Sequence, residues 1–182
     1  MHLDGARGLN AVQRLKVAPS TMVSDFDTVN FCLSKGMGCP VGSMVIGSKE
    51  DIEHARVLRK MLGGQMRQVG ILAICGLISL EDWQERLQND HDNARWIATE
   101  MAEKISYVTG IGNIDTNIFR FSLKPDYMKL KKIDHTGFCD LLRQNNILIN
   151  PSFANDAIRV VTHRDVSRQQ LEQFFKTLKA LT

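Results

Sequence analysis

Two short segments decide the fold of this chain: His2-Leu3-Asp4-Gly5-Ala6-Arg7 and Phe31-Cys32-Leu33-Ser34-Lys35-Gly36. In each, an apolar extended run gives way to a turn that contains glycine. Asp4, Arg7 and Lys35 stand at these transitions. In open α/β sheets, ligands bind where strands end in loops. A lysine that ends an apolar strand is a candidate Schiff-base amine, because loss of hydration favours the neutral nitrogen, whose lone pair can attack a carbonyl.

The elements around these segments indicate a layered α/β region. Strands are predicted at Thr28 to Leu33 and at Met44 to Ile46. A helix is predicted from Lys49 to Leu62, and a second, from Met66 to Leu80, is apolar almost all round and should be buried. The chain opens on the end of a strand. Because a parallel sheet needs neighbouring βα units, we expect further strands upstream and interpret the chain as a fragment.

The second half of the chain predicts a smaller α+β arrangement. A long helix over about Glu81 to Ile105 should join two lobes, and the composition changes near Thr109. The following elements are predicted in order as a strand at 117–123, a helix at 134–144, strands at 147–149 and 157–161, and a last helix capped by Ser167 and Gln170. We therefore expect domains at 1–106 and 107–182.

Composition limits the possible functions. Apolar residues make up 43% of the chain and charged residues 24%, as in ordinary globular proteins, and the net charge is only +3. No basic run points to nucleic acid or to a membrane surface. The longest apolar stretch, from Val69 to Leu80, is shorter than the roughly 20 residues that span a bilayer. The four cysteines show no disulfide or metal-site spacing, so we expect a reducing, cytoplasmic location.

Several longer motifs carry a family resemblance. The chain resembles the low-specificity L-threonine aldolases, which are pyridoxal-phosphate (PLP) enzymes of the aspartate-aminotransferase fold type. The resemblance covers nearly the whole chain but only the C-terminal half of the family's length. It rests on His-x-Asp-Gly-Ala-Arg, on Ser-Lys-Gly with Pro-Val-Gly-Ser, on Arg-Lys-Met-Leu-Gly-Gly-x-Met-Arg-Gln, on Asp90-His91-x-Asn93-Ala94-Arg95, on Thr116-Asn117 and on Arg159-Val160-Val161-Thr162-His163-Arg164-Asp165-Val166-Ser167.

The resemblance implies a fold and an oligomer. The fold class is α/β: the C-terminal part of a PLP-dependent transferase-like large domain, with a mostly parallel sheet and helices, followed by a small α+β C-terminal domain. The full-length form should be a homodimer or homotetramer. In the aldolases, the segment matching Lys60 and Arg67 reaches the neighbouring subunit's active site, where the counterpart of Arg67 helps bind the PLP phosphate. The alternative is that both positive charges only interact favourably with the helix dipole near a helix end.

The resemblance also implies roles for four residues. Lys35 would bear the PLP; the alternative is a solvated turn lysine. Asp4 would pair with the pyridine nitrogen of PLP, or would only form an Asx turn with Gly5. Arg7 and Arg159 would hold the substrate carboxylate through the planar guanidinium fork, and Arg7 would also reach the cofactor. For Arg159, which lies in an apolar strand, the alternative is a structural ion pair with an acid.

The implied reaction is PLP-dependent retro-aldol cleavage of L-threonine or L-allo-threonine to glycine and acetaldehyde, a step of threonine catabolism. No histidine of the chain is an obvious base, and the cofactor-stacking histidine and the phosphate loop of the family have no counterpart here. We expect the 182 residues alone to be inactive or nearly so. Two alternatives stay open: another lyase or racemase of the same PLP fold, or a non-catalytic remnant that binds a partner.

Overall fold

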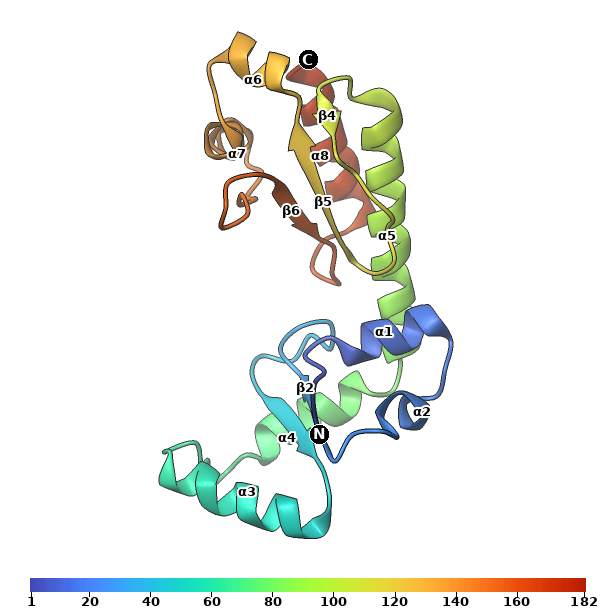
Figure 1. Ribbon diagram of the computed structural model, residues 1–182, viewed down its shortest axis with the longest axis vertical. Coiled ribbons are helices and arrows are strands. Elements are labelled where there is room, and N and C mark those ends of the chain that lie inside the picture. The colour runs from blue at the N-terminus through green and yellow to red at the C-terminus, as the bar shows by residue number, and fades with distance from the viewer. The chain divides into compact units, whose positions relative to one another are not determined.

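The computed structural model describes residues 1–182, which form two compact units (Figure 1). The N-terminal unit comprises Met1–Leu87 and the C-terminal unit Gln88–Thr182. The division falls inside α5 (Trp83–Lys104), whose first turn belongs to the N-terminal unit. The domain boundary expected after residue 106 stays a prediction.

A mixed three-stranded sheet organises the N-terminal unit. It has the order β1 (His2–Asp4), β2 (Thr28–Cys32), β3 (Ser43–Ile46), with β1 and β2 parallel and β3 antiparallel to β2. The helices α1 (Gly8–Leu15) and α2 (Pro19–Val23) form the crossover that a parallel pair requires. The predicted strands at 28–33 and 44–46 are thus confirmed to within a residue at each end.

The register of the parallel pair is supported by side chains as well as by the backbone ladder. His2 lies opposite Thr28, and Asp4 lies opposite Asn30. The Nδ1 atom of His2 is 2.8 Å from Oγ1 of Thr28, and the Gly5 amide donates to Oδ1 of Asn30 over 2.9 Å. Both contacts therefore connect β1, or the residue directly after it, with β2, and they are consistent with the register of the backbone ladder.

Two helices of the N-terminal unit follow the sheet. The helix α3 (Lys49–Met61) begins at the N-cap Ser48, whose hydroxyl accepts the Asp51 amide, and none of its residues is buried. The apolar helix α4 (Gly70–Ser79) is shorter than predicted, and only Gly76 and Ser79 are buried. The prediction of a buried helix is therefore wrong for this chain, because only one edge of α4 meets the small core of the unit.

That core contains six buried apolar side chains, drawn from α1, from the loop after β2 and from the start of α5: Val12, Leu33, Met37, Cys39, Trp83 and Leu87. The exposed apolar residues of β3, α3 and α4 lie outside it. The N-terminal unit therefore combines a small core with a large uncovered apolar surface.

The C-terminal unit has an antiparallel sheet in the order β4 (Val108–Thr109), β5 (Ile118–Leu123), β6 (Ile158–Val161). Its helices are α5, α6 (Pro125–Lys131), α7 (His135–Gln144) and α8 (Arg168–Ala180). The predicted capping box of Ser167 and Gln170 is formed at the start of α8. The helices α5 and α8 pack through an edge-to-face contact of Trp96 and Phe175.

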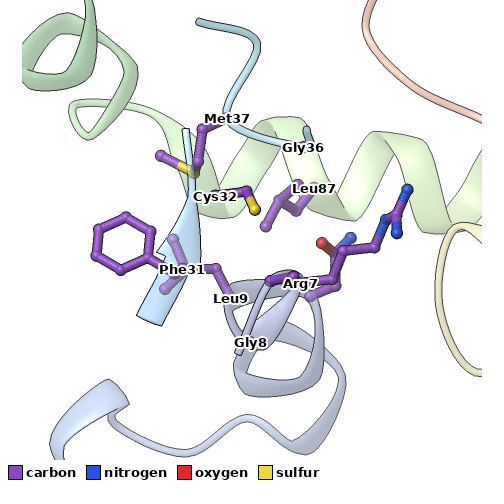
Figure 2. A pocket seen from close by; sticks show the side chains of 10 residues that line it. Arg7, Gly8, Leu9, Phe31, Cys32, Gly36, Met37 and Leu87 are labelled. Carbon is purple, nitrogen blue, oxygen red and sulfur yellow. The ribbon is translucent and has the colours of Figure 1, made fainter. Parts of the chain in front are cut away.

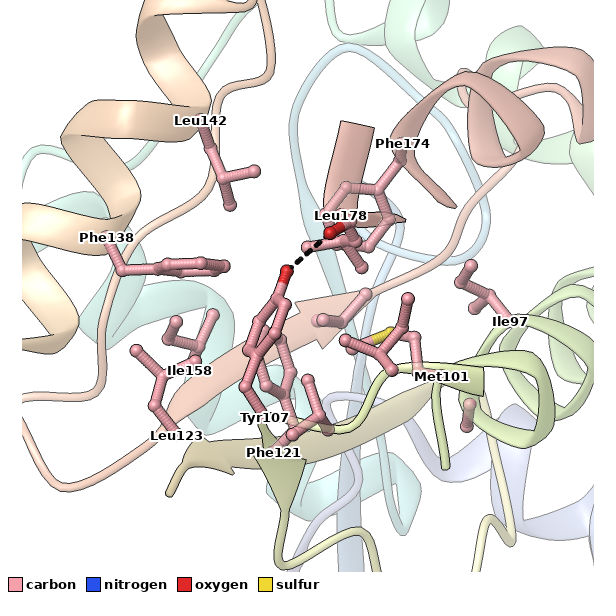
Figure 3. Close-up of a cluster of buried hydrophobic side chains, with 14 of the residues drawn as sticks. Ile97, Met101, Tyr107, Phe121, Leu123, Phe138, Leu142, Ile158, Phe174 and Leu178 are labelled. Atoms are coloured by element: carbon pink, nitrogen blue, oxygen red, sulfur yellow. Dashed lines mark hydrogen bonds between the residues drawn. The ribbon is translucent and has the colours of Figure 1, made fainter. Parts of the chain in front are cut away.

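Eighteen buried apolar residues form one cluster in the C-terminal unit (Figure 3). Phe121, Phe138 and Leu178 are fully buried in it. The Tyr107 hydroxyl donates to the Leu178 carbonyl over 2.7 Å, which ties the start of the sheet region to α8. Burial, together with the neighbouring Tyr127 phenol, raises the pKa of Tyr107.

The strand predicted at Ile147–Ile149 is not formed. These residues have no regular secondary structure, and only Pro151 makes an isolated antiparallel bridge, to Ile158 of β6. Pairing is a nonlocal event, so a run of apolar β-branched residues does not by itself determine that a strand forms.

A membrane-spanning helix is absent from the structure, in which no helix combines the necessary length and apolar character.

Candidate functional site

The carboxyl end of β1 presents Asp4 in a tight turn. Oδ1 of Asp4 accepts the Ala6 amide over 3.2 Å, so the Asx turn considered from the sequence is present. Asp4 is exposed, whereas the following Gly5 is buried. A Cβ atom at Gly5 would lie 2.6 Å from the Asn30 carbonyl oxygen, so this close approach of β1 and β2 requires glycine. The turn directs the chain into α1, for which Arg7 is the N-cap residue.

The carboxyl end of β2 presents Lys35 on a structured loop. Leu33, Met37 and Cys39 are buried, and Lys35 between them is exposed. Backbone hydrogen bonds close the loop: the Gly38 amide donates to the Lys35 carbonyl, and the Cys39 amide to the Leu33 carbonyl. The three buried side chains anchor the loop in the core, so the backbone that carries Lys35 is held in place on both sides of the lysine.

Glycine is also required directly after Lys35. A Cβ atom at Gly36 would lie 2.9 Å from Cδ2 of Leu87 and 3.2 Å from Oδ1 of Asn10. Both neighbours are buried, and the Leu87 contact is closer than real Cβ contacts come. The Ser-Lys-Gly segment therefore fits this loop for a steric reason that is independent of any chemistry.

Asp4 and Lys35 lie at one edge of the sheet. Asp4 is the last residue of β1, and Lys35 lies in the loop after β2, the neighbouring parallel strand. Parallel strands end at the same edge, so residues 31 positions apart in the chain come to adjacent strand ends. A carboxylate and an amine are thus carried by neighbouring strand ends, the position at which ligands bind in open α/β sheets.

A small hollow borders this edge (Figure 2). Its volume of about 10 Å³ admits a water-sized group, and neither Asp4 nor Lys35 lines it. This chain therefore brings the two strand ends together without enclosing a cofactor-sized cavity between them. The hollow is lined by Ala6, Arg7, Gly8, Leu9, Asn10, Phe31, Cys32, Gly36, Met37 and Leu87.

Arg159 lies in the C-terminal unit, on β6. Its neighbours Ile158 and Val160 point into the core, and Arg159 points out, as strand alternation dictates. Arg159 is exposed and makes no ion pair, so the alternative of a structural ion pair with an acid is not formed, and its predicted role in carboxylate binding stays a prediction. It lines an open groove of about 670 Å³ together with the segment 145–151 and the first turns of α8.

Lys60 and Arg67 lie on either side of the break between α3 and α4. Both are exposed, and neither forms a hydrogen bond or an ion pair within this chain. Gly63, at the break, has a φ of 76°, which glycine adopts without strain. The stop that Gly63-Gly64 predicted for the helix is thus present, and the charges beside it are left free for partners.

A polar network around the buried His135 in the C-terminal unit was missed by the sequence reasoning. Nδ1 of His135 donates to the Asn155 carbonyl over 2.9 Å, and Nε2 faces the Ser122 hydroxyl over 2.9 Å. The amide of Gly137 and the side chain of Asn155 donate to Asp134 and hold the pKa of that carboxyl below its ordinary value. The network fixes the loop that leads into β6, and hence into Arg159.

A second missed group supports the loop of Lys35. It consists of Ser79 at the end of α4 and Arg86 in α5. The only local signal for it was the spacing of Asp82 and Arg86, which suits an i,i+4 ion pair.

Solved structures share this fold. A candidate aromatic amino acid beta-eliminating lyase/threonine aldolase from Exiguobacterium sp. 255-15 has a TM-score of 0.75 at 14% identity, over 100% of this chain and 52% of that one. A candidate L-allo-threonine aldolase from Listeria monocytogenes EGD-E has a TM-score of 0.75 at 16% identity, again over 100% and 52%. The fold is therefore that of the α/β lyases and transferases that use PLP.

Sequence comparison defines the family more closely. The description "Beta-eliminating lyase" fits residues 1–119, and the chain belongs to that family. It is 38% identical to the low specificity L-threonine aldolase of Escherichia coli K12 over 95% of this chain and 48% of that protein. It is 33% identical to low-specificity L-threonine aldolase 1 of Arabidopsis thaliana over 92% and 45%. These proteins are PLP-dependent lyases, as the motifs predicted, and the chain spans about half of their length.

Proposed function

We propose that this polypeptide is part of a PLP-dependent threonine aldolase that cleaves L-threonine or L-allo-threonine to glycine and acetaldehyde. The observation that carries the proposal is that Asp4 ends one strand and Lys35 follows the end of the neighbouring parallel strand. The similarity to low-specificity L-threonine aldolases supports the substrate class. The chemistry of the donors fits PLP, which needs an amine for its aldehyde and an acid for its ring nitrogen.

Each residue at the sheet edge has a defined task in this proposal. Lys35 would hold the cofactor through its Nζ atom, the amine that the PLP aldehyde requires. Asp4 keeps the proton on the ring nitrogen, because a nearby negative charge stabilises the protonated ring at neutral pH. When bound, PLP supplies the electron sink that accepts the electron pair of the broken Cα–Cβ bond.

The two arginines bind the carboxylate of the amino acid. Arg7 is half-buried at the start of α1, and Arg159 faces an open groove without an acidic partner. A planar guanidinium binds a carboxylate through two parallel hydrogen bonds. Arg159 is free to do so, since no acid of its own unit competes for it.

A second copy of the chain covers the apolar surface of the N-terminal unit in the complete protein, as a homodimer or homotetramer. That surface is formed by β3, the end of α3 and α4, and includes Ile46, Met61, Leu62, Ile71, Leu77 and Ile78, each more than half exposed. Monomers rarely expose contiguous apolar patches of this kind. Lys60 and Arg67 are close to this surface in the chain and exposed, and in this proposal Arg67 reaches a PLP phosphate in the second copy.

The proposal also assigns the two sheets to domains and the protein to a cellular location. We place the sheet of β1, β2 and β3 in the PLP-binding large domain, and the antiparallel sheet in the small C-terminal domain. The location is the cytoplasm, which the unpaired cysteines support.

The absence of a cofactor-sized cavity favours a second candidate, a non-catalytic remnant that only binds a partner. One experiment separates the two. The 182-residue chain is incubated with PLP, reduced with borohydride and mapped by mass spectrometry. The aldolase proposal expects a label on Lys35 in clear excess over the exposed Lys49, and its loss in Lys35→Ala but not in Lys49→Ala. Equal labelling of both lysines would favour the remnant.

Turnover is measured in parallel as glycine released from L-threonine. We expect little or none from this chain, because it lacks a closed site. Robust release that Lys35→Ala abolishes would refute the expected inactivity. Release from other amino acids in preference to threonine would point instead to another lyase or racemase of this fold.

A further inference from the structure

The carbonyl of Met37, two residues after Lys35, has a side-chain partner from outside its loop. The Ser79 hydroxyl, at the end of α4, donates to it. Met37 and Ser79 are each 2% exposed, so water does not replace this bond. A buried carbonyl without a partner would cost free energy, and the serine removes that cost at the loop that carries Lys35.

Arg86 fixes the direction in which Ser79 donates. One terminal nitrogen of Arg86 lies 3.1 Å from Oγ of Ser79 and 2.8 Å from the Ser79 carbonyl, and it donates to both. A hydroxyl has one proton and two lone pairs. Because the guanidinium occupies a lone pair, the proton is left to point at the Met37 carbonyl.

Arg86 is itself held in place at some cost. Its other terminal nitrogen lies 3.1 Å from Oδ1 of Asp82, and its side chain is only 16% exposed. Its Nε atom is buried and has no hydrogen-bond partner. Native proteins leave few buried donors unsatisfied. An exposed cation could neutralise the end of α4 without this penalty, so the buried position points to a role in orienting Ser79.

We propose that Ser79 and Arg86 are positioning residues for Lys35: the chain of contacts Asp82–Arg86–Ser79–Met37 holds the lysine loop in one conformation before any ligand binds. This inference rests on the proposed function only for the role of Lys35 itself. The anchoring of the loop is a property of the free polypeptide and can be measured without PLP.

The first test is hydrogen exchange on the cofactor-free 182-residue chain. The readouts are the Gly38 and Cys39 amides, which close the loop onto the Lys35 and Leu33 carbonyls. In Ser79→Ala and in Arg86→Met both amides should exchange about tenfold faster, the effect of losing a buried hydrogen bond. The amides of β2 should keep their rates.

Matched controls exist in the same chain. Ser24→Ala removes an exposed serine hydroxyl that donates to the Thr21 carbonyl, and Arg95→Met removes an exposed arginine paired with Asp92 on α5. Neither should change the loop amides. Unchanged loop exchange in Ser79→Ala, or an equal rise throughout the N-terminal unit, would overturn the proposal. Ser79→Ala removes a single oxygen, so it decides the matter even if Arg86→Met fails to fold.

The second test adds PLP and borohydride and compares labelling of Lys35 with that of Lys49. In Ser79→Ala and Arg86→Met the excess at Lys35 should fall severalfold, and the label on Lys49 should not change. If the loop amides exchange faster in the variants but the excess of label on Lys35 over Lys49 stays as in the parental chain, the positioning role is overturned. If the parental chain shows no excess, the proposed function fails, and the exchange of Gly38 and Cys39 still decides whether the loop is anchored.

Discussion

The two units of this chain bury their apolar residues to very different degrees. The C-terminal unit gathers eighteen buried apolar residues in one cluster, whereas the N-terminal unit has six. In the C-terminal unit, α7 and α8 each bury four residues; in the N-terminal unit, α3 buries none and α4 buries only a glycine and a serine. The C-terminal unit therefore has the larger apolar core, and the N-terminal unit leaves more of its apolar residues exposed.

The most direct test of this difference in burial is to truncate one large side chain in each unit and compare the loss of stability. Phe121→Ala, at a fully buried position, should lower the free energy of unfolding by about 3–5 kcal/mol. Ile74→Ala, on the half-exposed α4, should lower it by less than about 0.5 kcal/mol. Urea unfolding followed by circular dichroism measures both. A loss at Ile74 comparable to that at Phe121 would mean that α4 is covered in the isolated chain.

Helix caps sharpen the comparison at a smaller scale. Ser167→Ala removes the capping box of α8, which packs on the core, and should cost about 1 kcal/mol of unfolding free energy. Ser48→Ala removes the equivalent bond to the Asp51 amide at the start of α3, which has no buried residue. It should raise amide exchange within α3 and leave global unfolding unchanged. An equal loss of global stability in the two variants would contradict the difference between the units.

The smallest expected effect is a loss of stability of the C-terminal unit at low pH. Asp134 and Asp156, both in the C-terminal unit, have carboxyl pKa values below the ordinary 3.8, because Gly137 and Asn155 donate to the first and Ser152 to the second. A lowered pKa in the folded state stabilises the protein above the unfolded value, and this contribution is lost as the pH falls through the folded value. The C-terminal unit should therefore weaken below about pH 4.

Asp134→Asn tests this dependence, since asparagine still caps a helix but does not titrate there. The slope of unfolding free energy against pH below pH 4 should become shallower in this variant, by urea unfolding at each pH. A slope equal to that of the parental chain would show that Asp134 does not contribute.

Local patterns in the sequence predicted the elements well. The apolar positions Trp83, Leu87, Ala94, Ile97 and Met101 predicted α5, and all of them are buried. The glycine turns after β1 and β2 predicted where the candidate site would lie. The short elements α2, β4 and α6 were missed, because a few residues carry too little periodicity to indicate a helix or strand.

Burial and pairing were less predictable than the elements. The apolar run of α4 predicted a buried helix, but whether a helix is covered depends on what packs against it. The segment Ile147–Ile149 predicted a strand, and its pairing with β6 stops at the bridge of Pro151. Ser79 and Arg86 belong to no sequence motif. Their role depends on the hydrogen bond from Ser79 to Met37, two residues that are 42 positions apart in the chain and that only the fold brings together.

The pairing of β1 with β2 also determines which face of the sheet carries the acid. Successive side chains alternate, so a slip of one residue would turn the Asp4 carboxylate to the opposite face while the strands stayed paired. The contact of His2 with Thr28 and that of Gly5 with Asn30 would both be lost in such a slip. Substitutions at Thr28 or Asn30 therefore act on the orientation of Asp4 even though Asp4 itself is unchanged.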